Sequence, residues 1–323
     1  MTELTFPVLP EEDGRLIKHV LRARGVSVRL ANSLKRVPGG MRLNGGSVAR
    51  TVDPVKAGDV LTLCIPGDET VPEPIACALD IVYEDGDVLV VDKPPTLPMH
   101  PSHNHQGDTL ANAVSAYLAG KGRQAAFRSA GRLDKGTSGL VVCCLHSYAA
   151  SKLNGRVEKA YCALAHGEYH GAGVFENAIY RPFPNRTLRA CRDYADPREP
   201  GDESAVTHWE ALAYHPNEPA GSPGTPIYHP NEPAGSRDGV TLLRVWLETG
   251  RTHQIRAHFA HHGTPLLGDD YYGAPPREEP GHFLHCGEVK FIHPVTGEEL
   301  RFHTGLPERF VKLTKPFPFI EKR

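Results

Sequence analysis

Apolar residues near the start of the chain recur at helical spacing. In RLIKHVLRARG, residues 15–25, four branched apolar side chains share one helix face, and Gly25 suits the helix end. A second helix is expected over residues 29–36, after which Asn-Gly and Ala-Gly-Asp turns separate short β runs up to residue 66. The first part of the chain therefore predicts a compact module of two helices and a small sheet.

Short apolar runs replace this pattern farther along the chain. LDIVYEDGDVLVVDKP, residues 79–94, has two β runs joined by Asp-Gly, which is a hairpin signal. Strands and helices then follow each other without strict alternation, which favours an α+β fold with a mixed, largely antiparallel sheet over a doubly wound one. The expected strands are 140–145, 159–165, 206–213 and 241–248, and the expected helices are 108–120, 147–154 and 252–262.

Two segments have the composition of irregular structure. Residues 67–76, GDETVPEPIA, are acidic and carry two prolines, as a linker does. The nonapeptide YHPNEPAGS occurs at 214–222 and again at 228–236, and its Pro, Gly, Asn and Ser predict a flexible insert at about residues 214–238. The expected organisation is a module over residues 12–66, a linker over 67–76 and a larger domain over 77–323.

Composition narrows the class of protein. No apolar run approaches the ~20 residues of a membrane-spanning helix, and the start MTELTFPVLPEEDG lacks the basic stretch and apolar core of a secretory signal. The seven cysteines form no C-x-x-C pair, which favours reduced thiols over a disulfide framework. We expect a soluble, cytoplasmic protein.

Positive charge is concentrated at one end of the chain. The net charge is −2, yet residues 14–66 hold ten Lys and Arg against two acids. Clustered cations bind nucleic acid by releasing its condensed counterions, although a solvated basic surface would have the same composition. The two basic helices followed by RLNGGSV and VKAGDVLTL resemble the S-four-type RNA-binding domain, with Ile17 where that family usually has Asp. The resemblance implies that the module binds RNA.

One acid stands out in the larger domain. The decapeptide GRLDKGTSGL, residues 131–140, sets Asp134 between Arg132 and Lys135. An exposed acid beside an arginine is usually a surface pair of little energetic weight. Here small turn-forming residues and the apolar run LVVCCL follow, so Asp134 is expected on a rigid loop anchored to a buried strand. Active-site residues are often held in this way.

Six stretches within residues 80–303 belong together. They are VVDKPPTLPMHPS, GDTLANAV, GRLDKGTSGLVV, EKAYCALAHGE, LETGRTHQIRAHFAHHGTPLLGDDYYG and LHCGEVKFIHPVTGEEL. In this order and spacing they resemble the RluA-type RNA pseudouridine synthases, apart from Gly131, where the family commonly has His or Asn. The resemblance implies isomerisation of uridine within RNA: the bond from uracil N1 to the ribose breaks, the base turns, and C5 joins the same carbon.

The resemblance also assigns roles to four residues. Asp134 is the carboxylate that acts where the breaking glycosidic bond develops positive charge; attack on the anomeric carbon and removal of a ribose proton both stay open. Arg256 keeps Asp134 ionised in a site that excludes water, on a helix that Thr252 is expected to cap. Arg132 enters the helix stack where the nucleotide is extruded, and Tyr161 stacks on the flipped uracil and is a candidate for taking the C5 proton. Neither a metal nor an organic cofactor is implied.

Three alternatives stay open. The histidines of HPSHNH and HFAHH could serve a metal hydrolase, although no acidic ligand accompanies them in a recognisable pattern. A non-catalytic RNA-binding or RNA-folding protein could keep the same scaffold, but its signature would be a lost acid, and Asp134 is present. Ribosomal RNA is favoured over transfer RNA as the partner, and a monomer suffices for the chemistry.

Overall fold

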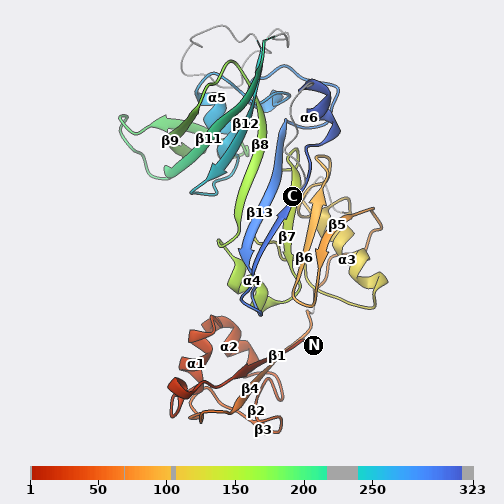
Figure 1. Cartoon of the computed structure of the whole chain (residues 1–323), viewed down its shortest axis with the longest axis vertical. Helices are drawn as coiled ribbons and strands as arrows, with labels where there is room; N and C mark the ends of the chain where they lie inside the picture. Colours follow the sequence, from red (N-terminus) through yellow and green to blue (C-terminus); the bar gives the residue numbers. More distant parts are fainter. Residues whose placement is uncertain (1, 69, 103–106, 217–238, 315–323) are drawn as a thin grey trace.

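The small N-terminal module has a hydrophobic core of its own. A computed structural model describes residues 2–68, 70–102, 107–216 and 239–314 of the chain. In the module, α1 (Ile17–Ala23) and α2 (Val28–Leu34) share this core with a four-stranded sheet (Figure 1). Its strands are β1 (Thr2–Pro7), β2 (Met41–Leu43), β3 (Ser47–Val48) and β4 (Val60–Ile65), and they lie in the order β1-β4-β2-β3.

The module begins earlier than the expected residue 12. β1 pairs along its whole length with β4, from Thr2 opposite Ile65 to Pro7 opposite Val60. The alternation in TELTFP buries every second side chain in the middle of this strand, which is the pattern of a strand with one face on a core. A boundary at residue 12 therefore cuts through the module's sheet.

One ten-stranded sheet runs through the larger domain. Its strands are β5 (Asp80–Glu84), β6 (Val88–Lys93), β7 (Ser138–Cys144), β8 (Glu158–His166), β9 (Ala172–Tyr180), β10 (Ala190–Asp193), β11 (Glu203–His215), β12 (Val240–Leu247), β13 (Leu284–Ile292) and β14 (Glu299–His303). They lie in the order β10-β9-β11-β12-β8-β13-β7-β6-β5, with β14 paired to β13. Among these described pairs, β7 and β13 are parallel and the others are antiparallel. The expected α+β fold with a mixed, largely antiparallel sheet is confirmed.

Helices cover this sheet only in places. All seven residues of β7 are buried, as the continuous apolar run predicts for a central strand. In Figure 1, α3 lies beside β5 and β6, α4 lies at the end of the sheet nearest the module, and α5 lies beside β11 at the opposite end. The helices are α3 (Leu110–Gly120), α4 (Ser147–Leu153), α5 (Gln254–His261) and α6 (Glu308–Leu313).

A packed junction joins the two domains. Tyr148, from α4 of the larger domain, is 2 % exposed and belongs to the core of the module, where its ring centroid lies 5.8 Å from that of Phe6. Its hydroxyl donates to the carbonyl of Arg24 at 2.9 Å, and the Lys152 ammonium donates to the same carbonyl at 3.3 Å. The module is thus docked on α4 and shares apolar packing with it.

The connecting segment, residues 67–76, is irregular where it is described, and it is attached to the larger domain. Asp68 accepts a hydrogen bond from Arg128 at 2.8 Å, and Ser115 of α3 donates to the carbonyl of Pro72 at 2.7 Å. The duplicated nonapeptide lies outside the described residues apart from residues 214–216. No helix in the described part of the chain is long and apolar enough to cross a membrane.

Candidate active site

The loop that carries Asp134 is fixed at both its turn and its exit. The Thr137 backbone N–H donates to the Asp134 carbonyl at 3.1 Å, which closes the turn. Gly139 has a φ of 112°, and a Cβ there would collide with the backbone of Cys286 on β13. The TSG sequence therefore does two things: it closes the turn, and it lets β7 run directly against β13.

Two buried side chains that pack against the loop of Asp134 hold it in place. The Thr137 hydroxyl lies 2.8 Å from Nε2 of His282. The Lys93 ammonium at the end of β6 is fully buried and donates to the carbonyls of Leu97 and Lys135 at 2.8 and 3.1 Å. Burial lowers the pKa of Lys93 to about 7, and the negative charge of Asp134 opposes that shift. Lys93 therefore links the segment that follows β6, through Leu97, to the loop of Asp134, through Lys135.

Arg256 on α5 joins two carboxylates. Its Nη1 donates to Oδ2 of Asp134 at 3.0 Å, and its Nε and Nη2 donate to the two oxygens of Asp269 at 2.7 and 2.8 Å. The side chains are 8 % exposed for Arg256, 1 % for Asp269 and 15 % for Asp134, so solvent screens these contacts little. Asp269 thus orients the guanidinium, and the guanidinium presents one N–H group to Asp134.

The charges around Asp134 have different origins. Burial alone would lower the pKa of Arg256, but the attraction of Asp269 and then of Asp134 raises it above its ordinary value. His253, whose Nε2 lies 3.8 Å from Oδ2 of Asp134, has its pKa lowered to about 4 by burial, despite the opposing effect of Asp134. At neutral pH the positive partner of Asp134 is therefore Arg256, while His253 is a neutral neighbour.

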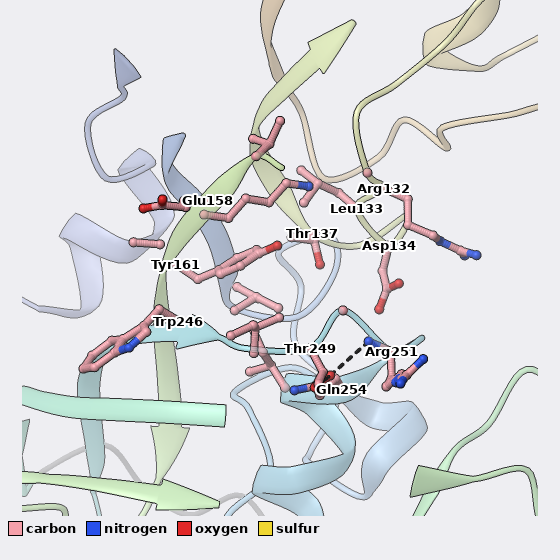
Figure 2. Close-up of a pocket in the computed structure, with 18 of the residues that line it drawn as sticks. Arg132, Leu133, Asp134, Thr137, Glu158, Tyr161, Trp246, Thr249, Arg251 and Gln254 are labelled. Atoms are coloured by element: carbon pink, nitrogen blue, oxygen red, sulfur yellow. Dashed lines mark hydrogen bonds between the residues drawn. The ribbon is translucent and has the colours of Figure 1, made fainter. Parts of the chain in front are cut away.

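A cleft of about 1050 Å³ opens over Asp134. Figure 2 shows the Asp134 carboxylate on one side of the view and the Tyr161 ring on the other, with the Tyr161 hydroxyl pointing toward Thr137. Tyr161 is 7 % exposed, and burial raises its pKa well above the ordinary value for a phenol. The lining comprises residues 130–134, 137, 154–161 and 246–256, with Arg244, Leu284 and Glu288.

The structure brings the four residues expected in the site to this cleft. Asp134, Arg132, Tyr161 and Arg256 all line it. Arg132 is exposed, and in Figure 2 its side chain points away from Tyr161. The expected helix cap is wrong: α5 begins after His253, not Thr252, and His253 has a left-handed φ of 56°. This turn brings the His253 ring close to Asp134.

Sequence reasoning missed the support around the acid. Asp269 lies in the stretch GDDYYG, next to a second acid, Asp270. Nothing in that stretch says which acid faces inward, whereas the structure buries Asp269 and exposes Asp270. The residues next to Lys93 in the sequence likewise do not indicate that it supports the site. A lysine within an apolar run, VLVVDKPP, is the available signal, because lysine is almost never fully buried without partners.

The histidines of HFAHH have separate surroundings. His258 is fully buried with its ring centroid 6.2 Å from that of Phe175, His261 lies 2.9 Å from Asp193, and His262 stacks on Phe175 at 4.0 Å. Of the other group, residues 103–106 lie outside the described part of the chain. Within the described residues, HFAHH therefore supplies core and surface contacts.

Comparison with known proteins identifies the class first. The fold is that of a pseudouridine synthase: the solved structure of human RNA pseudouridylate synthase domain containing 1 superposes with a TM-score of 0.53 at 24% identity, covering 70% of this chain and 83% of that one. The family model described as RNA pseudouridylate synthase matches residues 87–261. The chain belongs to this family, and it is an RNA pseudouridine synthase.

Two curated relatives extend the match beyond the family model. The chain is 32% identical over 309 residues to the Bacillus subtilis protein named uncharacterized RNA pseudouridine synthase YjbO, covering 93% of this chain and 98% of that protein. It is also 32% identical over 296 residues to ribosomal large subunit pseudouridine synthase D of Vibrio cholerae, covering 85% of this chain and 82% of that one. The expected isomerase activity on RNA is confirmed at the level of the family.

Proposed function

We propose that this enzyme converts uridine to pseudouridine in ribosomal RNA with Asp134 as its catalytic carboxylate. The main support for the proposal is the position of Arg256. Asp269 fixes its guanidinium, which donates to one oxygen of Asp134 at 3.0 Å, at the wall of a cleft of about 1050 Å³. The guanidinium fixes the position of the carboxylate and faces it with a positive charge. The carboxylate can then stabilise the anomeric carbon or form a bond to it as the glycosidic bond breaks.

The reaction needs no atom from outside the uridine and solvent protons. The C1′–N1 bond breaks, the uracil turns within the cleft, a C1′–C5 bond forms, and the proton on C5 is lost while N1 gains one. Tyr161 enters this sequence as a neutral phenol, because burial raises its pKa. A neutral ring suits stacking on the uracil better than it suits accepting the C5 proton.

Arg132 is proposed to act when the nucleotide leaves the stack. It is exposed at the cleft, two residues before Asp134, and no ion pair to another described residue fixes its side chain. A free guanidinium there can stack on bases or contact the phosphate backbone of the opened strand.

The N-terminal module is proposed to be an S-four-type RNA-binding domain. Lys18, Arg22 and Arg29 on its helices are exposed, and none of them has an ion-pair partner among the described residues. Other cations of the module are neutralised, as Arg24 is by Glu12 and Arg50 by Asp53. Part of the positive charge that remains available to RNA phosphates is therefore on α1 and α2.

Ribosomal RNA is the proposed substrate because a relative of 32% identity, from Vibrio cholerae, is named for the ribosomal large subunit. Asp134, Tyr161 and Arg256 come from one copy of the chain, so we propose a monomer. We place its action in the cytoplasm, where bacterial relatives of this kind would meet ribosomal RNA.

Two measurements test the proposal together. Pseudouridines are mapped in total RNA from cells with the gene, without it, and with the gene encoding Asp134→Asn. We expect one or more ribosomal sites to lose pseudouridine without the gene and to stay unmodified with Asp134→Asn. Asp270→Asn serves as the control, because that acid is exposed and next to the site. Modification by Asp134→Asn at the wild-type level would contradict the catalytic assignment, and loss confined to transfer RNA would contradict the substrate.

A further inference from the structure

Lys159 is a lysine of the cleft that has no role in the proposed reaction. It lies on β8, two residues before Tyr161, and lines the same cleft. Its ammonium lies against the loop of Asp134: a Cβ built on Gly131 would be 3.0 Å from Nζ and 3.6 Å from Cε of Lys159. The lysine thus reaches the backbone three residues before the catalytic carboxylate.

This ammonium has no anionic partner among the described residues. No carboxylate of the described chain lies within ion-pair distance of Lys159, whereas Arg256, which also lines the cleft, has two carboxylates. The thiol of Cys286 is the group whose charge would most favour the charged form of Lys159. Burial raises the pKa of this thiol to about 12, so it is neutral at pH 7. Burial lowers the pKa of Lys159. Burial therefore disfavours the charged form of Lys159 in the free protein, and a bound anion favours that form again.

The substrate supplies such an anion. Every nucleotide of RNA carries one phosphate, and extruding a uridine into a cleft brings the flanking backbone to its rim. A lysine binds phosphate as a point charge that needs no fixed orientation. We propose that Lys159, whose ammonium lies in the space that Gly131 leaves beside the loop, binds the backbone phosphate next to the extruded uridine. This inference rests on the proposed function of Asp134, because that residue defines where the uridine lies.

Gly131 makes the arrangement possible. Its φ is +90°, a conformation that glycine adopts without strain. Any side chain at this position would start 3.0 Å from the Lys159 ammonium and push it aside. Asn tolerates a positive φ better than other residues do, so Gly131→Asn fills this space at a small backbone cost. The two positions should therefore act as one unit in binding.

Binding measurements in the Asp134→Asn background separate this role from chemistry. The probe is the ribosomal RNA fragment that contains the mapped site, labelled and titrated at several salt concentrations. For Lys159→Gln we expect about tenfold weaker binding at low salt, the effect of removing one charged hydrogen bond, and a salt slope lower by about 0.7. Lys159→Arg keeps the charge and should restore most of both values. Lys121→Gln is the matched control, because that lysine is bound to Glu84 away from the cleft.

Turnover in the wild-type background adds a second readout. Lys159→Gln should raise KM with kcat little changed, since a phosphate contact is made both before and during reaction. Gly131→Asn should weaken binding similarly, and adding Lys159→Gln to it should cost little more. Binding and salt slope equal to those of the Lys121→Gln control would overturn the proposal, as would a loss of kcat with unchanged binding. An active Asp134→Asn enzyme would instead overturn the site itself, and that result is independent of Lys159.

Discussion

Asp269 offers the sharpest test of how the site works, because it binds Arg256 and does not itself line the cleft. Asp269→Asn keeps the shape of the side chain and removes its charge. Arg256 gives Asp269 two hydrogen bonds of 2.7 and 2.8 Å, and asparagine can accept only one of them, without charge. The guanidinium then loses the partner that orients it toward Asp134.

The magnitude follows from these hydrogen bonds. Losing one charge-assisted hydrogen bond in a buried pair costs about 1.5 to 3 kcal/mol of unfolding free energy. At about 2 to 3 °C per kcal/mol for a chain of this size, the melting temperature should fall by about 3 to 9 °C. A catalytic group displaced by about 1 Å can lose about a hundredfold in rate, so we expect kcat to fall between about tenfold and a hundredfold, with KM for RNA nearly unchanged.

The assay is steady-state pseudouridine formation on the mapped RNA, together with thermal unfolding of each variant. Asp270→Asn is the matched control: it is the next residue, it is also an acid, and it is exposed, so both values should stay near those of the wild type. An Asp269→Asn enzyme with kcat within about twofold of the wild type would refute the orienting role. A loss of activity in the Asp270 variant of the same size would show that the effect is not specific to the Arg256 contact.

Two further predictions concern the module and pH. Changing Lys18, Arg22 and Arg29 together to Gln should weaken RNA binding and lower its salt slope by about 0.7 to 0.9 for each phosphate that is no longer neutralised. Arg50→Gln is the control, because this arginine is paired with Asp53, and its salt slope should stay that of the wild type. An unchanged slope in titrations of the triple variant would exclude these helices as the RNA-binding surface. Burial lowers the pKa of His253 and His285 to about 4 and that of His258 to about 3. Since the unfolded chain takes up protons below about pH 6.5 and the folded chain does not, stability should be lost as pH falls from 6.5 toward 4, by about 1 kcal/mol per histidine per pH unit. Urea unfolding at pH 7 and 5.5 measures this, and equal free energies at the two values would contradict it.

The sequence predicted the elements better than their contacts. The helix face of RLIKHVLRARG, the buried run LVVCCL and the loop of Asp134 follow from local periodicity and turn residues, and these are properties of neighbouring positions. Strand β1 was not predicted, because its six residues alternate only weakly and become a strand by pairing with β4, about sixty residues away. The same limit applies to the site. Asp134 could be singled out from its own loop, whereas choosing Asp269 over Asp270 depends on which of them faces Arg256, 13 positions earlier in the chain.

Tyr148 has a consequence for how a target is chosen. Because this side chain from one domain completes the core of the other, swivelling the domains would open an apolar pocket to water. The distance between the basic helices of the module and the Asp134 carboxylate is therefore held fixed by this packing. In the proposed function, in which the module binds RNA, an RNA whose stem and uridine match that distance engages both sites at once and gains from the high effective concentration of the second contact. A shorter or longer RNA would engage only one of the two sites.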